Sequence, residues 1–270
     1  MTSFSADWLA LREPADHAAR SQTLTSRLAD RLDGAAGLRA IDLAAGSGSN
    51  VRYLLPRLPD LAHWTLVDYD PALLAEAWRL LAPVAHAADR SFDVRQADLQ
   101  ALASLPLEGC ALVTASALLD LVSESWLRAF ASRCRAARVH VLCALSYDGR
   151  IECQPADPGD RLVRDLVNRH QKTDKGFGPA LGPDAARVGA DCFRDEGFEV
   201  ETAASDWVLD AALGALQREL LEGWAGAARE VSPGQAAAVD AWLARRLSHV
   251  ETGVSRIRVG HVDLVATLPR

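Results

Sequence analysis

The sequence lacks the features that would place the chain in a membrane or in an oxidising compartment. No apolar run approaches the roughly 18 residues that a bilayer-spanning helix needs. The N-terminal residues MTSFSADW show no basic segment followed by an apolar one, so no signal peptide is expected. The five cysteines form no C-x-x-C pair and no metal-ligand spacing. This pattern favours reduced thiols in a cytoplasmic protein and predicts no metal site.

Positive charge is also scarce in this chain. The 29 Lys and Arg residues are outnumbered by 36 Asp and Glu residues, which gives a formal net charge of −7. A broad nucleic-acid surface needs a basic face, so this balance argues against a nucleic acid as partner. The length of 270 residues and the hydrophobic fraction of 49% are those of an ordinary globular protein. They favour one large domain with insertions over two domains.

The most informative stretch is AIDLAAGSGSN, residues 40–50, together with LVDYDP, residues 66–71. Each predicts a short buried strand that ends in an acid, Asp42 in the first and Asp68 in the second. Gly46 and Gly48 permit backbone angles that a side chain would forbid, and they let the main chain approach a ligand. Asp68 follows Gly48 by about 20 residues, where a carboxylate can bind both hydroxyls of a ribose. The layout predicts a nucleotide-type site at the open end of a parallel sheet.

Two classes of ligand use such a layout. A dinucleotide places its pyrophosphate on the helix N-terminus and needs G-x-G-x-x-G, but Val51 occupies the position of the third glycine. Asp42 precedes the turn, where it would repel a pyrophosphate and attract a ligand with a cationic methionine tail. An NAD(P)-dependent Rossmann oxidoreductase is therefore the less favoured alternative.

In the motif D-x-x-x-G-x-G at residues 42–48 and in Asp68, the chain resembles motifs I and II of the class I S-adenosylmethionine-dependent methyltransferases. The resemblance covers about residues 38–145, and the family usually has glycine at the position of Ala44. It implies an S-adenosylmethionine site made of Asp42, Ala44, Gly46, Gly48, Asn50, Asp68, Tyr69, Asp98, Leu99, Ser116 and Ala117. In this family, Asp98 would contact the adenine amino group, whereas Asp98 alone is also typical of a helix N-cap.

The fold that the resemblance implies is α/β. It is a Rossmann-like, seven-stranded, mostly parallel sheet with an antiparallel last strand, helices on both faces, and helical insertions after strands 5 and 6. We expect strands at about 40–43, 63–68, 92–94, 110–115, 139–145, 198–202 and 256–268, with a turn at 147–150, a short extra strand at 150–153 and a β-bulge at Gly260. We expect helices at about 14–32, 51–58, 71–81, 121–134, 159–172, 184–196, 209–224 and 232–250.

The domain organisation follows from these elements. Residues 1–36 are interpreted as an N-terminal helical cap whose helix starts near Pro14 and ends at Gly34. Such a leading helix closes over the ligand site in the resembling family, or it covers a sheet edge. Residues 37–270 form the cofactor-binding domain, with substrate-side insertions at about 147–183 and 207–252.

Methyl transfer from a sulfonium depends mainly on aligning the acceptor, because the cofactor carries the reactivity. The chain contains neither the N/D-P-P-Y-type motif nor the Pro-Cys nucleophile of enzymes that methylate nucleic-acid bases. We therefore expect O- or N-methylation of a small molecule by in-line displacement. A protein or RNA methyltransferase, and a non-catalytic S-adenosylmethionine-binding module, remain as alternatives.

Acceptor-binding and catalytic candidates lie near the ends of the fourth and fifth strands. A general base assists a hydroxyl or protonated amine acceptor, and the candidates for this role are Tyr147, Asp148 and His170. His170 also fits a solvent-facing helix end. Basic residues are in excess near residues 160–175, which suggests a small acceptor with a carboxylate or phosphate. The candidate acceptor-binding residues are Asp120, Arg169, Lys172, Lys175 and Phe177. Asp120 is equally well explained as a helix cap, and the Gly-Phe-Gly-Pro loop as a packed turn or as a lid.

Overall fold

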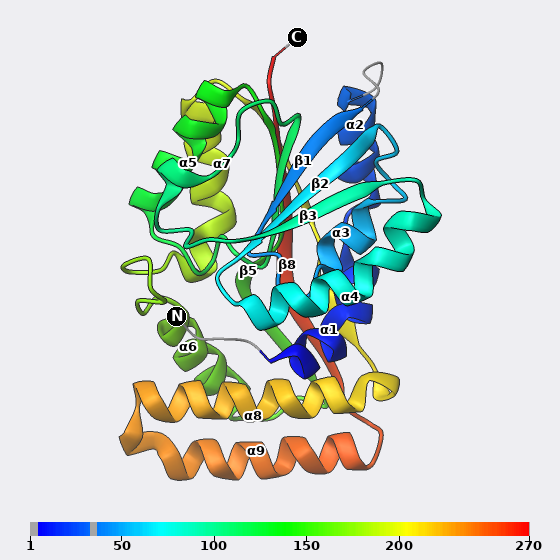
Figure 1. Ribbon diagram of the computed structural model, residues 1–270. Helices are drawn as coiled ribbons and strands as arrows, with labels where there is room; N and C mark the ends of the chain where they lie inside the picture. The colour runs from blue at the N-terminus through cyan, green and yellow to red at the C-terminus, as the bar shows by residue number, and fades with distance from the viewer. Residues whose placement is uncertain (1–4, 33–36, 270) are drawn as a thin grey trace.

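The computed structural model describes residues 5–32 and 37–269, and a single twisted sheet runs through its centre (Figure 1). The strand order is β3-β2-β1-β4-β5-β8-β6, and β7 pairs with β8 beside this path. The strands are β1 Leu38–Leu43, β2 Leu61–Asp68, β3 Ser91–Gln96, β4 Leu112–Ser116, β5 His140–Gln154, β6 Glu199–Ala204, β7 Trp207–Leu209 and β8 Arg256–Thr267. Strands β1 to β5 are parallel, and β8 is antiparallel to β5 and β6. The predicted fold class is confirmed, and β7 is an addition that was not predicted.

Helices cover both faces of the sheet, as predicted. On one face lie α2 (Gln22–Leu32), α3 (Ser49–Leu54) and α4 (Pro71–Ala87), and on the other lie α5 (Glu124–Ala137) and α7 (Ala185–Asp195) (Figure 1). Strand β1 shows why both faces are covered. Ala40 packs into the core beneath α2 to α4, and Ile41 and Leu43 pack into the core beneath α5 and α7.

A third layer of helices lies across the far end of the sheet. It contains α6 (Asp160–Gln171), α8 (Gly214–Val231) and α9 (Ala236–Glu251), with α1 (Ala6–Ala19) beside it (Figure 1). These helices and the ends of β5 and β8 share a separate apolar core that includes Val163, Leu216, Trp242 and Ile257. The two predicted insertions therefore build one layer together.

Several predicted boundaries were wrong for physical reasons. The predicted helix at 14–32 is two helices, because the chain leaves the helical conformation at Arg20, and Pro14 lies inside α1. Helix α3 ends at Leu54, not at residue 58, because Pro56 has no N–H to continue it. Helix α8 starts only at Gly214, after β7 and a short 3₁₀ turn. The predicted stop at Gly34 lies outside the described residues.

Strand β5 is continuous where a strand, a turn and a second strand were predicted. Tyr147 pairs with His261 and Ile151 pairs with Val259, so β5 carries extra residues at this point. The irregularity does lie opposite Gly260, but the bulging strand is β5 and not β8. A Cβ on Gly260 would lie 2.1 Å from Oδ1 of Asp148, so only glycine fits beneath the bulge. The length of β5 lets it reach the third layer.

Candidate active site

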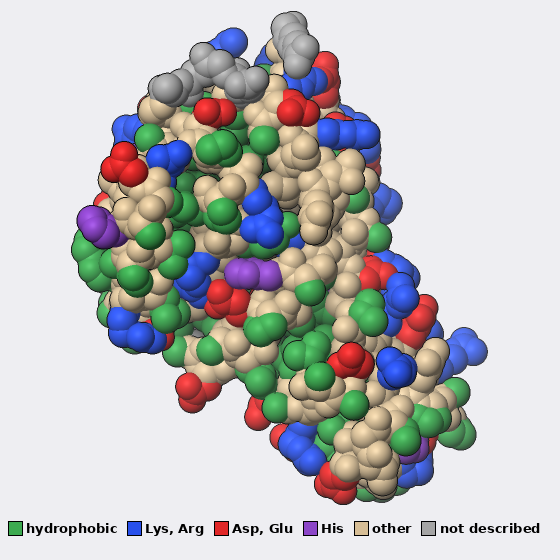
Figure 2. All heavy atoms as spheres, turned by 90° about the vertical axis from the view of Figure 1, so that its right-hand side faces the viewer, with side chains coloured by type: hydrophobic (Ala, Val, Ile, Leu, Met, Phe, Trp, Pro, Cys, Tyr) green, Lys and Arg blue, Asp and Glu red, His purple; other side chains and the backbone are tan. Residues whose placement is uncertain are grey.

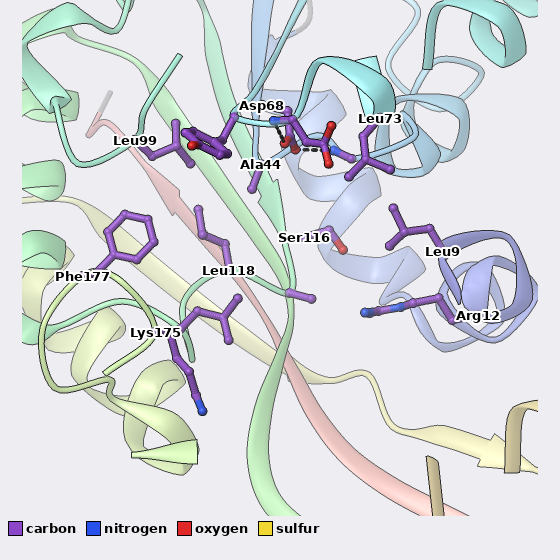
Figure 3. Close-up of a pocket in the computed structure, with 15 residues that line it drawn as sticks. Leu9, Arg12, Ala44, Asp68, Leu73, Leu99, Ser116, Leu118, Lys175 and Phe177 are labelled. Carbon is purple, nitrogen blue, oxygen red and sulfur yellow. Dashed lines mark hydrogen bonds between the residues drawn. The ribbon is translucent and has the colours of Figure 1, made fainter. Parts of the chain in front are cut away.

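A cavity of about 210 Å³ opens at the carboxyl ends of β1, β2 and β4 (Figure 3). Seven of the predicted cofactor residues line it: Ala44, Gly46, Asp68, Tyr69, Leu99, Ser116 and Ala117. The remaining lining residues were not predicted for the cofactor: Leu9, Arg12, Asp70, Leu73, Leu118, Leu121, Lys175 and Phe177. In Figure 3, Leu9 and Arg12 of α1 face Lys175 and Phe177 across the cavity. Lys175 and Phe177 belong to the loop at 173–183, which we call the insertion loop. Two segments that are distant in sequence therefore close it from opposite sides.

Asp68 is held in place by backbone donors of two turns. The N–H of Gly46 donates to Oδ2 at 2.7 Å, and the N–H of Asp70 donates to Oδ1 at 2.9 Å. A carboxylate oxygen can accept more than one hydrogen bond. Both oxygens of Asp68 can therefore still accept a hydrogen bond from a ligand with two adjacent hydroxyls.

The turn after β1 keeps the shape of a glycine turn. Ala44, Gly46 and Gly48 have φ values of 51°, 52° and 80°, all in the left-handed region. This conformation costs an alanine about 1–2 kcal/mol, so the fold holds Ala44 in a glycine-like conformation. A Cβ on Gly46 would lie 3.0 Å from Cδ1 of Leu9. Gly48 is the N-cap of α3 and packs beneath the turn against Leu66.

Asp42 lies beneath the turn and is fully buried, and neither it nor Asn50 lines this cavity. Its Oδ1 accepts a hydrogen bond from Nδ2 of Asn50 at 2.8 Å, and Nη1 of Arg20 donates to Oδ1 of Asn50 at 2.6 Å. Within the described part of the chain, Oδ2 of Asp42 has no hydrogen-bond partner. Burial raises the pKa of Asp42 to about 7, although Asn50 and Arg20 oppose this shift. Asn50 and Arg20 line a small recess of about 70 Å³ beside the turn.

Asp98 is exposed and lies outside the cavity that Leu99 helps to line. Its Oδ1 accepts a hydrogen bond from the N–H of Gln100 at 2.9 Å, so it stabilises a turn. The geometry therefore gives no support to the adenine contact, and Asp98 is not a helix N-cap either, because the next helical turn, Leu102–Ser104, has Ala101 as its N-cap. Leu99 is buried, and its carbonyl oxygen accepts a hydrogen bond from Nε1 of Trp126 at 2.8 Å.

A second cavity, of about 610 Å³, adjoins the first, and we call it the acceptor chamber. The two cavities share four lining residues: Arg12, Ala117, Leu121 and Lys175. The walls of the acceptor chamber carry Trp8 from α1, Tyr147 from β5, Trp207 from β7 and Trp224 from α8. The chamber thus lies between the sheet and the third layer.

Two buried polar side chains line the acceptor chamber, Asp120 and His261, each 6% exposed. Burial raises the pKa of Asp120 to about 6, and hydrogen bonds from its own N–H, the charge of Arg12 and the N–H of Tyr147 oppose the shift. Burial and the nearby charge of Arg12 lower the pKa of His261 to about 3, so its ring is neutral near pH 7. The N-cap of α5 is Ser123, so the capping interpretation of Asp120 was wrong.

No protein-family model matches this chain, and no curated protein sequence matches it significantly. Several solved structures resemble it over most of its length. The YcgJ protein of Bacillus subtilis has a TM-score of 0.52 and 12% identity, and the alignment covers 91% of this chain and 98% of that one. A candidate methyltransferase from Bacillus halodurans C-125 has a TM-score of 0.53 and 12% identity, and the alignment covers 91% of this chain and 99% of that one. Mycolic acid cyclopropane synthase CmaA1, crystallised with S-adenosylhomocysteine and CTAB, has a TM-score of 0.53 and 15% identity. The alignment covers 97% of this chain and 94% of that one.

The chain has the class I S-adenosylmethionine-dependent methyltransferase fold. Antiparallel β8 between β5 and β6 distinguishes this methyltransferase fold from the dinucleotide-binding order 3-2-1-4-5-6. This strand order argues against the alternative of a nicotinamide-dependent Rossmann oxidoreductase. The described residues contain no group of His, Cys, Asp and Glu that could hold a metal ion. They also contain no helix with the length and apolar character to span a membrane.

Two of the three predicted catalytic residues line the acceptor chamber, and the third lies outside it. Tyr147 lines the acceptor chamber, but its hydroxyl donates to Oδ1 of Asn168 at 2.7 Å, and burial raises its pKa. His170 also lines the chamber, and its Nε2 lies 3.2 Å from Oε2 of Glu230. Asp148 instead lies in a separate surface recess, where its carboxylate pairs with Arg150. The geometry therefore gives Asp148 no part in the chamber.

Of the three predicted acceptor-binding cations, Lys175 lines the cavities, whereas Arg169 and Lys172 do not. Lys175 lines both cavities, and Phe177 lines the cofactor cavity with its ring 5.6 Å from that of Trp126. Arg169 and Lys172 are exposed, and Nζ of Lys172 pairs with Oδ2 of Asp184 at 2.8 Å. The described structure therefore does not gather these cations around an acidic acceptor.

Sequence reasoning missed Arg12, which lines both cavities and the small recess. Its Nε and Nη2 donate to the carboxylate of Asp16 at 2.9 and 3.1 Å, and Trp207 donates to the same carboxylate at 3.0 Å. The i, i+4 spacing of Arg12 and Asp16 predicts their ion pair. It does not predict that the pair faces the ligand site, because Trp207 and the cavities come from distant segments.

Proposed function

We propose that the protein is an S-adenosylmethionine-dependent methyltransferase that transfers a methyl group to an oxygen or nitrogen atom of a small molecule. One observation carries the proposal: the cavity lined by the predicted cofactor residues adjoins the acceptor chamber, and Ala117 and Leu121 line both. The chamber volume of about 610 Å³ is in the range of small-molecule pockets. A sulfonium bound beside Ser116 and Ala117 would face the chamber.

The residues of the cofactor cavity suit the parts of S-adenosylmethionine. Asp68 would accept hydrogen bonds from the ribose hydroxyls, and Tyr69 and Leu99 would flank the adenine. The small recess contains Asp16, Arg20 and Asn50, which offer charges of both signs to a zwitterionic amino-acid tail. Asp42 would act indirectly, by orienting Asn50.

In methyl transfer, the main task of the protein is to position the acceptor. When bound, the cofactor supplies an activated methyl group. The chain aligns the acceptor for in-line attack and excludes water, with α1 and the insertion loop covering the two sides of the cavity. The face drawn in Figure 2 mixes acidic and basic side chains, and the net charge of −7 favours a small molecule over RNA.

Binding and turnover can be tested separately. Isothermal titration calorimetry should show that S-adenosylhomocysteine binds with one site per chain, whereas NAD does not bind. Methyl-labelled S-adenosylmethionine should then label members of a panel of phenols, aromatic amines and N-heterocycles. Binding of NAD in place of S-adenosylhomocysteine would overturn the proposal. Cofactor binding without labelling of any small molecule would instead support a non-catalytic binding module.

A further inference from the structure

The acceptor chamber contains two buried polar atoms without a partner. Oδ1 of Asp120 and Nδ1 of His261 have no hydrogen-bond partner among the described residues, although both side chains line the chamber. An unpaired buried polar group costs about 1–3 kcal/mol. A ligand that bonds to both atoms would recover this free energy, so the chamber is built for a ligand with complementary polar groups.

The cations of the chamber have protein partners already. Arg12 donates twice to Asp16, and Nζ of Lys175 lies 2.9 Å from Oγ1 of Thr173 and 3.3 Å from Nδ1 of His170. Burial lowers the pKa of Lys175, which disfavours its charge further. The group of the chamber that most needs a partner is therefore a carboxylate, and its partner must be a hydrogen-bond donor.

The apolar walls narrow the class of ligand. Three of the seven tryptophans of the chain, Trp8, Trp207 and Trp224, line the chamber together with Tyr147. Aromatic side chains prefer offset or edge-to-face contact with other rings. A planar aromatic ligand would satisfy these walls, and a neutral His261 ring could either donate or accept a hydrogen bond.

This inference rests on the proposed function and specifies its acceptor. We propose that the acceptor is an aromatic molecule with a hydroxyl or amino group, and that Asp120 binds this group and takes its proton during methyl transfer. The position of Asp120 fits this role, because it lines the acceptor chamber and its sequence neighbours Ala117 and Leu121 line both cavities.

The step balances in atoms and charge. The acceptor oxygen or nitrogen forms a bond to the methyl carbon while the bond between that carbon and the sulfonium sulfur breaks. The sulfur leaves as a neutral thioether, and the acceptor proton passes to the carboxylate of Asp120, from which solvent removes it. The pKa of about 6 makes Asp120 a stronger base than an ordinary aspartate.

Matched probes test the class of acceptor without knowledge of the natural one. With S-adenosylhomocysteine present, tryptophan fluorescence would measure the affinities of 2-phenylethylamine, 4-ethylphenol, phenylacetate and ethylbenzene. We expect 2-phenylethylamine or 4-ethylphenol to bind about tenfold more tightly than phenylacetate and ethylbenzene, because a hydrogen bond to a charged group contributes this much. The first two probes distinguish an amine acceptor from a hydroxyl acceptor.

The variant Asp120→Asn should abolish this preference and leave the affinity for S-adenosylhomocysteine unchanged. The matched control is Asp165→Asn, at an exposed carboxylate of α6 outside the chamber, and it should keep the preference. A preference for phenylacetate, the same preference in Asp120→Asn, or no binding of any probe would overturn the inference. If S-adenosylhomocysteine itself fails to bind the wild type, it is the proposed function that fails.

A pH series gives a second readout. The affinity for 4-ethylphenol should fall as the pH drops through about 6 in the wild type, because protonated Asp120 is a poorer acceptor, and this fall should be absent in Asp120→Asn. The other titratable or charged groups that line the chamber are Arg12, Tyr147, His170, Lys175, Glu219 and His261. They are present in both proteins, so only Asp120 accounts for a difference. An identical fall in both proteins would contradict the inference.

Discussion

At the scale of single residues, we expect cofactor binding to depend most on Asp68. Replacing it with alanine would remove the carboxylate that accepts hydrogen bonds from the N–H groups of Gly46 and Asp70 and that we expect to accept two more from the ribose hydroxyls. We predict that Asp68→Ala weakens S-adenosylhomocysteine binding by about tenfold to a hundredfold in calorimetry. Asp98→Ala is the control and should bind normally, because Asp98 is exposed and only supports a turn. Equal losses in both variants would contradict this account.

The buried carboxylate of Asp42 should affect how the free energy of unfolding depends on pH. Its pKa is about 7 in the folded protein and near 3.8 when unfolded, so folding favours the protonated form. Its contribution to stability is therefore complete below pH 3.8 and is lost as the pH rises towards 7. Asp42→Asn keeps an acceptor for Asn50 without the charge. The free energy of unfolding, measured by denaturant titration, should fall less with pH in Asp42→Asn than in the wild type.

The difference between the two pH curves isolates Asp42, because the other carboxylates are common to both proteins. Parallel curves between pH 3.8 and 7 would show that the buried carboxylate does not titrate in this range.

The contrast between these two residues shows how far the sequence predicts the site. The spacing of motifs predicts Asp68, Leu99, Ser116 and Ala117 correctly as lining residues, because they follow strands whose ends meet at one edge of the sheet. Spacing does not show that the Asp42 side chain turns beneath the loop. It also cannot bring His261, from the last strand, into the chamber, because this placement depends on long-range pairing of β8 with β5.

At the scale of elements, the insertion loop at 173–183 is the segment that we predicted as either a lid or a packed turn. Nε2 of Gln100 donates to the carbonyl oxygen of Gly176 at 2.6 Å, and Phe177 packs on Trp126. Lys175 of this loop lines both cavities. Its composition predicts a loop but not these contacts, which come from two other segments.

We predict that bound S-adenosylhomocysteine slows tryptic cleavage after Lys175, because the ligand holds the loop against the cavity. Mass spectrometry of a time course would follow the fragment that ends at this residue. The variant Lys175→Gln serves as the control, since it should never produce that fragment. Cleavage at the same rate with and without the ligand would identify the loop as a packed turn and not a lid.

Helices and strands that depend on local sequence were predicted better than those that depend on distant contacts. The sequence correctly predicted the existence of α4, α5, α6 and α7, whose buried residues join the three apolar cores. It did not predict the continuity of β5 through Gly149, because a glycine next to an aspartate is also typical of a turn. Pairing with β8 decides the conformation at this point.

At the scale of the whole molecule, one ion pair with a fully buried arginine joins two helices of the third layer. Arg246 of α9 is fully buried, and its Nε donates to Oδ1 of Asp160 in α6 at 2.9 Å. Its Nη1 donates to the carbonyl oxygen of Pro155 at 2.6 Å. The third layer therefore depends on this arginine as well as on its apolar core.

We predict that Arg246→Ala lowers the free energy of unfolding by about 3 kcal/mol, because it leaves the partly buried carboxylate of Asp160 without its charged partner. Arg245→Ala is a matched control at the next position. Arg245 is half-exposed where it pairs with Asp157, so solvent screens the pair and its loss should cost much less than the loss of Arg246. Urea denaturation of the two variants measures both values. A larger loss for Arg245→Ala than for Arg246→Ala would contradict the role given to the buried pair.

A crystal structure with S-adenosylhomocysteine tests the central claim of cofactor binding most directly. We predict that the ribose hydroxyls bind Asp68, that the adenine lies beside Leu99, and that the sulfur lies next to Ala117 and points into the acceptor chamber. A ligand bound elsewhere, or one whose sulfur faces away from Asp120, would contradict the assignment of both cavities.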